Sequence, residues 1–292
     1  MDNEVFNKKT VNKFSDKKGK LPESIEVEIV DGDEQLYKYG INPRDDQFLT
    51  NFEECYYGKK KESDEYPKGI KSTPKEVEDT IDDILYKKDN WEILDVFNIL
   101  AWKTGKINLE KSSRDNIEVA KSWDKNLFII QLPYHVQEKE KFYPFAEEVI
   151  KIRENYKKDK KVEDVWNSLI NYLIKNDFKN DIKGLGTVYL VTLLSFITKG
   201  DMPIFDRFAM AALTSFYFSD NGINIPYNSV ISGCMLPSKK DNLNRVLNLV
   251  SDSNSIYNKY IDLLNRYYSD KWKKDRKYDR ALWVYGHFFT VP

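Results

Sequence analysis

The chain is poor in the side chains that build disulfide frameworks and metal centres. Its 292 residues include only two cysteines, Cys55 and Cys234, and two histidines, His135 and His287. Two cysteines define no disulfide framework. The histidines have no partner at metal-ligand spacing, and the cysteines are too few for a structural zinc site or an iron–sulfur cluster. We therefore expect no metal and no cofactor.

Long hydrophobic runs are also missing. No apolar stretch approaches the roughly 20 residues that span a membrane, and the N-terminus lacks the apolar core of a signal peptide. The chain has no P-loop, no dinucleotide-binding fingerprint and no nucleophile elbow. We therefore expect a cytoplasmic protein without a membrane partner, and nothing in the sequence indicates a protein partner.

A basic excess is absent as well, because the formal net charge is −1 at pH 7. DNA-binding proteins more often carry such an excess. Two segments are nevertheless locally basic, and each is a candidate for a phosphate-facing surface. The alternative for each is a solvated helix end or loop. The first segment contains Lys151, Arg153, Lys157, Lys158, Lys160 and Lys161, and the second contains Lys271, Lys273, Lys274, Arg276, Lys277 and Arg280.

The composition is that of a folded protein, and the hydrophobic pattern is that of a mainly helical one. The chain is 41% hydrophobic and 14% aromatic, and it is long enough to bury a sizeable core. The clearest helix is predicted for residues 162–176, where apolar side chains recur at three- and four-residue spacing. Other helices are predicted from Thr73-Pro74, from about Asn90, around Phe145 to Ile152, and near residues 187–199, 207–218, 240–251, 254–269 and 277–287.

The N-terminal part has a different pattern. Apolar residues alternate with glutamate over residues 25–29, which predicts a short strand, and Asp31-Gly32 is placed to turn the chain into a second strand. Residues 55–73 are charged and are interrupted by glycine and proline, as is typical of a linker. We therefore predict an N-terminal extension with a small β element, residues 1–70, followed by a helical region, residues 71–292.

The strongest functional signal lies in residues 183–206. Lys183-Gly184-Leu185-Gly186-Thr187 predicts a tight Gly-x-Gly hairpin between two helices. The helix after the hairpin directs N–H groups and its dipole outward, which favours a phosphate; Lys183 adds charge and Thr187 a hydroxyl donor. Further on, Asp206 stands at the start of the next predicted helix. Taken separately, the glycines are explained by a helix C-cap and a turn, and Asp206 by an N-cap.

Together these features resemble the core of the helix-hairpin-helix (HhH-GPD) DNA glycosylase superfamily. Its members carry a leucine-proline-glycine-x-glycine hairpin, a helix, and a valine-proline-valine-aspartate segment. The matching residues are Ile182-Lys183-Gly184-Leu185-Gly186 and Met202-Pro203-Ile204-Phe205-Asp206, and the resemblance covers about residues 160–218. It implies a two-lobed helical fold that binds double-stranded DNA, with contacts from Lys183, Gly184, Leu185, Gly186, Thr187 and Arg207.

The resemblance also implies a mechanism. A target nucleotide is flipped out of the duplex into a pocket between two helical lobes. Cleavage of the C1′–N bond builds positive charge on the sugar, and a nearby carboxylate, matched here by Asp206, opposes that charge and activates water. Bifunctional members carry a lysine two residues after the second hairpin glycine, where this chain has Val188. Hydrolysis without strand cleavage is therefore expected.

The residues after Asp206 depart from the family pattern. Arg207-Phe208 replaces the common pair, and Arg207 is placed either to touch a phosphate or to pair with Asp206 and keep it ionised. Trp102 and Trp283 are candidates for stacking on the flipped base, with core packing as the alternative for each.

The sequence thus predicts a monofunctional DNA glycosylase that acts in repair or in defence against phage with modified bases. Two other functions stay open. One is a non-enzymatic nucleic-acid-binding protein that keeps the hairpin, and the other is a helical interaction protein that binds no DNA. Salt-dependent DNA binding and base release separate the three.

Overall fold

A computed structural model describes residues 44, 46–57, 74–103, 139–175, 186–221, 234–237 and 243–290. All regular structure in these ranges is helical, which confirms the mainly α class. The predicted β element near residues 25–39 lies outside the described residues, as does the predicted boundary near residue 70. The boundary and the two-lobed glycosylase arrangement stay predictions.

The described helices belong to two compact units. The first unit takes its described residues from 1–60, 205–236 and 252–292, and the second takes them from 61–204 and 237–251. Asp206 and Arg207 belong to the first unit, whereas Gly186 and Thr187 belong to the second.

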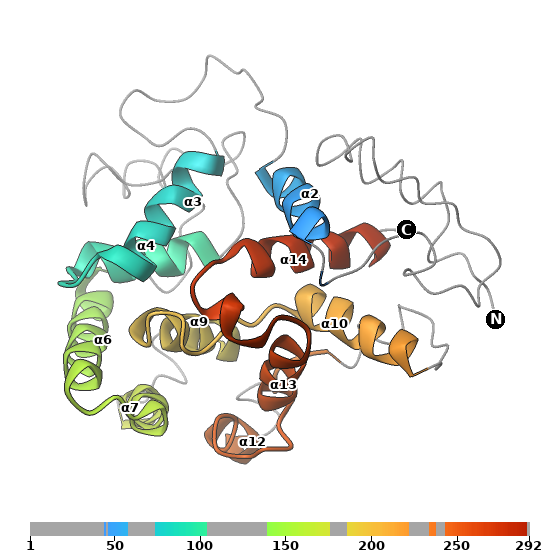
Figure 1. Ribbon diagram of the computed structural model, residues 1–292. Coiled ribbons are helices and arrows are strands. Elements are labelled where there is room, and N and C mark those ends of the chain that lie inside the picture. Colours follow the sequence, from blue (N-terminus) through green and yellow to red (C-terminus); the bar gives the residue numbers. More distant parts are fainter. Residues whose placement is uncertain are drawn as a thin grey trace. The chain divides into compact units, whose positions relative to one another are not determined.

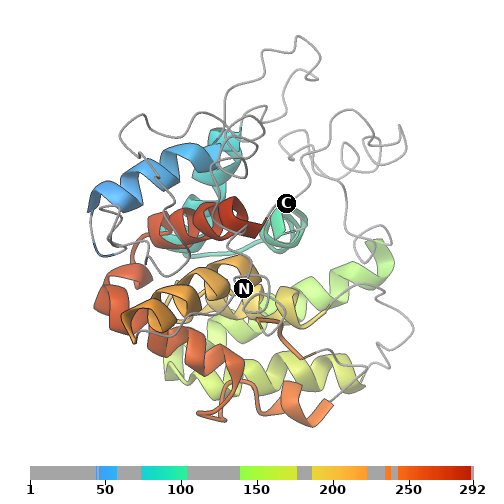
Figure 2. The same ribbon diagram turned by 90° about the vertical axis from the view of Figure 1, so that its right-hand side faces the viewer.

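The first unit is built around the C-terminal helix. Helix α14 (Lys277–Thr290) packs against α2 (Asp46–Tyr57) and α10 (Arg207–Asp220), as Figures 1 and 2 show. Helix α13 (Ile256–Tyr268) packs against α10 and leads into the 3₁₀ turn η5 (Ser269–Lys273). Aromatic side chains fill the space between these helices, and their ring centroids lie 4.8–6.0 Å apart among Phe48, Phe52, Phe216 and Tyr285.

Helix α2 was not predicted, and its last residues fall in the segment assigned to a linker. That assignment is wrong for Cys55–Tyr57, which are helical. The helix forms because Phe48 and Phe52, four residues apart on one face, are 5% and 1% exposed. The i, i+4 spacing of these two rings was the available signal.

Helices α10 and α14 approach each other closely at Gly286. A Cβ atom at Gly286 would lie 2.3 Å from the backbone oxygen of Phe208, in the first turn of α10. Because no side chain fits there, glycine sets how near the start of α10 lies to α14.

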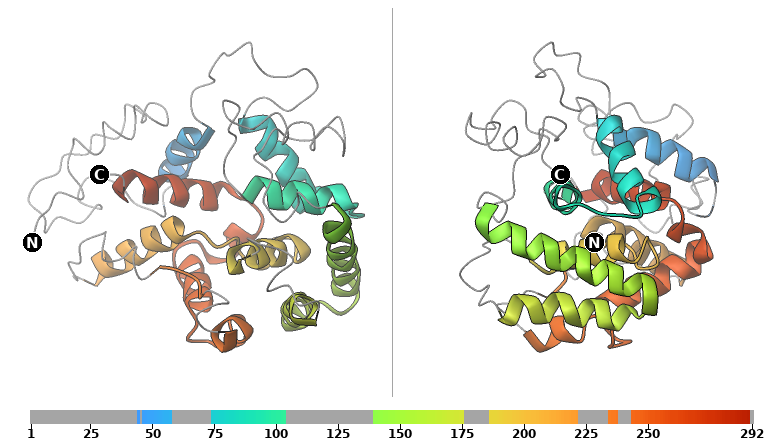
Figure 3. Two further views of the ribbon diagram at one scale, coloured as in Figure 1. Left: turned by 180° about the vertical axis from the view of Figure 1, so that it is seen from behind. Right: turned by 90° about the vertical axis from the view of Figure 1, so that its left-hand side faces the viewer.

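The second unit surrounds a buried helix. Helix α9 (Thr187–Ile197) packs against α4 (Ile93–Lys103), α6 (Lys139–Asp159), α7 (Val162–Lys175) and the π-helical turn η3 (Asp83–Lys87). Figure 3 shows α6 and α7 side by side. Helix α9 is apolar on all sides, and Leu190 through Thr198 are buried. The predicted helices at 162–176 and 187–199 are confirmed to within a few residues.

The remaining helices of this unit begin and end near local signals. Helix α3 (Pro74–Asp82) starts on the predicted proline, which suits the first helical position because it has no N–H to leave unpaired. Helix α12 (Leu243–Leu247) is much shorter than the predicted 240–251.

Candidate functional site

Asp206 directly precedes α10 and is half-buried. Its Oδ1 accepts a hydrogen bond from the backbone N–H of Phe208 at 2.8 Å, and its carbonyl accepts one from Met210 N at 2.9 Å. This is N-cap geometry, so Asp206 does cap the helix. Capping and catalysis do not exclude each other, because a cap bond fixes the direction of a carboxylate that is still half-exposed.

Phe205, the residue before Asp206, packs in an aromatic cluster and thereby fixes the backbone at Asp206. Phe205 is 2% exposed, and its ring lies edge-on to Tyr260 of α13 at 5.2 Å and tilted to Tyr257 at 6.4 Å. Asp206 therefore has little freedom on either side, since Phe205 is packed and Phe208 is hydrogen-bonded. Neither tyrosine was predicted as part of the site, although their i, i+3 spacing on one helix was visible in the sequence.

Burial and two nearby carboxylates raise the pKa of the Tyr260 side chain. Burial raises its pKa well above the ordinary value, and the charges of Asp279 and Asp206 raise it further. Asp279 lies in the first turn of α14 and forms an ion pair with Arg276 at 3.6 Å. The site in the first unit thus combines Asp206, Asp279 and a tyrosine that stays protonated at neutral pH.

Arg207 is exposed beside Asp206. Its guanidinium carbon lies 4.7 Å from the centre of the Phe208 ring, a cation–π distance that orders the side chain. Its predicted contact with a phosphate stays a prediction.

The hairpin is described only at its end. Lys183, Gly184 and Leu185 lie outside the described residues. Thr187 is 4% exposed, and its Oγ1 donates to the carbonyl of Pro237 at 2.6 Å. Because this hydroxyl already donates inside the protein, the donors that remain at this helix end are the first backbone N–H groups of α9.

Gly186 has open space where a side chain would be. Its φ of −81° and ψ of 174° suit any residue, and a Cβ there would meet no atom within 4 Å. The fold of the described chain therefore does not require glycine at this position. A ligand that approaches the backbone would require it.

Gly186→Val is expected to weaken DNA binding about tenfold without unfolding the protein. The branched side chain crowds a phosphate at the helix start, and one charge-assisted hydrogen bond is worth about 1.5 kcal/mol. The substitution costs stability by about 1 kcal/mol at most, through a poorer N-cap. Fluorescence anisotropy with duplex DNA across a salt series measures the effect, with Gly186→Ala as the smaller control. Unchanged affinity would make the hairpin a helix connector only.

The two tryptophans belong to different units and are half-buried. Trp102 donates from Nε1 to Glu78 at 2.7 Å and packs on Phe196 at 6.0 Å. Trp283 packs edge-on to Tyr56 at 5.3 Å. These contacts favour packing for both, and their stacking on a base stays a prediction.

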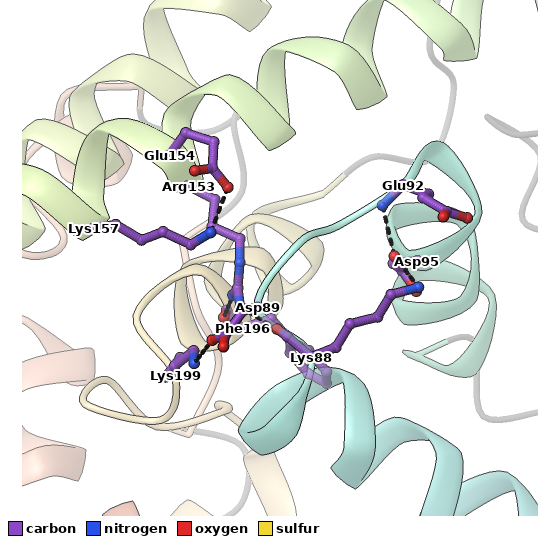
Figure 4. A network of polar contacts seen from close by, with 9 residues as sticks. All are labelled: Lys88, Asp89, Glu92, Asp95, Arg153, Glu154, Lys157, Phe196 and Lys199. Atoms are coloured by element: carbon purple, nitrogen blue, oxygen red, sulfur yellow. Dashed lines mark hydrogen bonds and ion pairs between the residues drawn. The ribbon is translucent and has the colours of Figure 1, made fainter.

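Arg153 corrects the prediction for the first basic segment. It is 1% exposed, donates to the carbonyls of Phe196 at 2.8 Å and Lys88 at 2.7 Å, and stacks 4.0 Å above Trp91. Burial lowers its pKa to about 10, so it remains charged at neutral pH. Figure 4 shows this arginine between α6, the end of α9 and the segment before α4. The prediction that Arg153 faces a phosphate is wrong, because its side chain is buried and donates to backbone carbonyls inside the second unit.

The arginines of the second basic segment are also buried. Arg276 and Arg280 are each 4% exposed, and Arg280 pairs with Glu53 of α2 at 2.9 Å. Arg280 thus joins α14 to α2 within the first unit, and the lysines are the surface charges of this segment.

Within the described ranges, no group of three or more histidine, cysteine, aspartate or glutamate residues is arranged to hold a metal ion. No helix among the described residues is both long and apolar enough to cross a membrane. Comparisons with family models, curated proteins and solved structures gave no match.

Proposed function

We propose that the protein is a monofunctional DNA glycosylase in which Asp206 is the catalytic carboxylate. The observation that carries the proposal is the fixed, half-buried position of Asp206. One oxygen is held by the Phe208 N–H at 2.8 Å, and the preceding Phe205 is packed between Tyr257 and Tyr260. A preorganised carboxylate stabilises a developing cation without having to reorient.

The proposed reaction is hydrolysis. The C1′–N bond of a flipped nucleotide breaks, its electron pair leaves with the base, and a water oxygen bonds to C1′. One proton from the water is transferred to the departing base or the solvent. Asp206 opposes the positive charge on the sugar and accepts a hydrogen bond from the attacking water.

In this proposal the hairpin grips the DNA backbone. The N–H groups at the start of α9 face a phosphate, and the hydrogen bond from Thr187 to Pro237 holds the first turn of that helix in place. Open space at Gly186 supports the proposal because it leaves room for the phosphate.

A panel of duplexes with damaged and naturally modified bases tests the function. The protein is incubated with each duplex, and free bases are detected by mass spectrometry. Release of one base or one class of bases supports the proposal. No release from any duplex, by a folded protein that binds DNA, favours a non-enzymatic binder in which Asp206 serves only as the observed helix cap.

The product is expected to be an intact abasic site. The position that carries the lysine of bifunctional members is Val188, which has no amine. Lys199 lies about 16 Å further along the helix direction, and its Nζ pairs with Asp89 at 2.6 Å. Strand breaks should therefore appear only after alkali or heat, and borohydride should trap no adduct. A trapped protein–DNA adduct would contradict this.

A further inference from the structure

The segment that joins α13 to α14 (Figure 1) is rich in lysine, and we call it the basic turn, Lys271–Lys277. Lys271 and Lys274 are exposed. Lys273 pairs with Asp270 at 2.6 Å, whereas neither Lys271 nor Lys274 forms an ion pair with any described residue. The turn therefore displays positive charge that the described protein leaves uncompensated.

The backbone that carries these lysines is held firmly. Trp272 is 6% exposed and donates from Nε1 to Asn265 at 2.9 Å. Lys277 N donates to the carboxylate of Asp275 at 2.9 Å, and Lys277 Nζ lies 5.3 Å from the centre of the Tyr278 ring. A fixed backbone lowers the entropy lost when the turn binds a ligand.

The other basic segment lacks this imbalance. At the junction of α6 and α7, residues 154–164 contain four lysines and four acidic residues, and Lys157 pairs with Glu154 at 2.6 Å. Residues 270–277 contain four lysines and only two acidic residues. Charge complementarity to a polyanion therefore favours the basic turn.

The basic turn belongs to the same unit as Asp206, and both adjoin helix α13. Helix α13, which carries Tyr260, leads into the turn, and the Tyr260 ring contacts Phe205 at 5.2 Å. Two residues after the turn, Asp279 acts on the same tyrosine as Asp206 does.

We propose that the basic turn binds the phosphate backbone of double-stranded DNA through Lys271, Lys274 and Lys277, beside the nucleotide on which Asp206 acts. The position of these phosphates beside the reacting nucleotide rests on the proposed function, whereas the attraction between the lysines and phosphates does not. Each ammonium group acts as a point charge that displaces a condensed counterion from the DNA.

Two matched double variants of the full chain test the proposal. Lys271→Gln with Lys274→Gln removes two charges from the basic turn. Lys158→Gln with Lys161→Gln removes the same charge from the junction of α6 and α7. Binding to an unmodified duplex is measured by anisotropy from about 50 to about 200 mM salt. Thermal unfolding checks that both variants remain folded.

The basic-turn variant should lose about 1.8 units of the slope of log affinity against log salt, so the ratio of wild-type to variant affinity should be about tenfold larger at about 50 mM than at about 200 mM salt. The control variant should keep its slope. Equal losses in both variants, or no loss in the first, would overturn the proposal.

The outcome separates the two proposals. If the protein releases a base but the lysine variants bind DNA normally, the glycosylase proposal holds and the proposal for the basic turn is refuted. If the basic-turn variant has a smaller slope of log affinity against log salt but no duplex releases a base, the basic turn is a DNA-binding surface and the glycosylase proposal is refuted. If the protein binds no DNA at low salt, both proposals are refuted.

Discussion

Asp206→Asn is expected to abolish most base release while the protein stays folded and still binds DNA. Removing one preorganised electrostatic stabiliser typically costs about 10²- to 10³-fold in rate. Asparagine keeps the side-chain oxygen that accepts from Phe208 N at 2.8 Å, so the cap survives and only the charge is lost. Single-turnover base release, DNA affinity and thermal unfolding are measured together.

Two further variants separate capping from charge. Asp206→Ala removes the cap as well and should destabilise the protein by about 1 kcal/mol, which Asp206→Asn should not do. Asp252→Asn is the matched control, because Asp252 makes the same kind of bond, to Asn254 N at 2.9 Å, in an exposed part of the first unit. It should keep full activity. A folded Asp206→Asn variant with full activity would refute the catalytic role.

The helices that could be predicted from the sequence are those with a complete local signal. Helix α7 shows apolar residues at three- and four-residue spacing over its whole length, and α3 begins on a proline. Helix α2 was missed because its apolar face is short and its flanks are charged, so the spacing of Phe48 and Phe52 is a weak signal beside the packing against α14. Secondary structure was thus predictable where the buried residues of one segment recur at regular spacing in the sequence.

The candidate site was only partly predictable, because its supports come from distant segments. Asp206 could be found from its own segment, but its neighbour Tyr260 lies on α13. Arg153 looked like a surface cation in a lysine-rich run, and nothing local shows that it reaches the carbonyls of Phe196 and Lys88. A buried arginine differs from an exposed one only through tertiary contacts.

Gly286 illustrates the same limit and ties the packing of the first unit to Asp206. No turn or positive φ is involved, because Gly286 lies within α14. Its role comes from the backbone of Phe208, whose O and C atoms would lie 2.3 and 2.6 Å from a Cβ. Since Phe208 N also holds the carboxylate of Asp206, any displacement of this turn moves the carboxylate.

Gly286→Ala is therefore expected to lower both stability and activity. The methyl group meets backbone rather than a flexible side chain, so α10 must shift, and overpacking of this kind costs about 1–3 kcal/mol. A shift of about 1 Å at Asp206 reduces base release about 10²-fold. Urea unfolding and single-turnover base release at a temperature where the variant is folded measure the two effects. Gly186→Ala is the matched control for stability alone and should change it little, because its Cβ meets nothing within 4 Å. Wild-type stability of Gly286→Ala would contradict the close approach of the helices, and wild-type base release by a destabilised variant would show that this contact does not position Asp206.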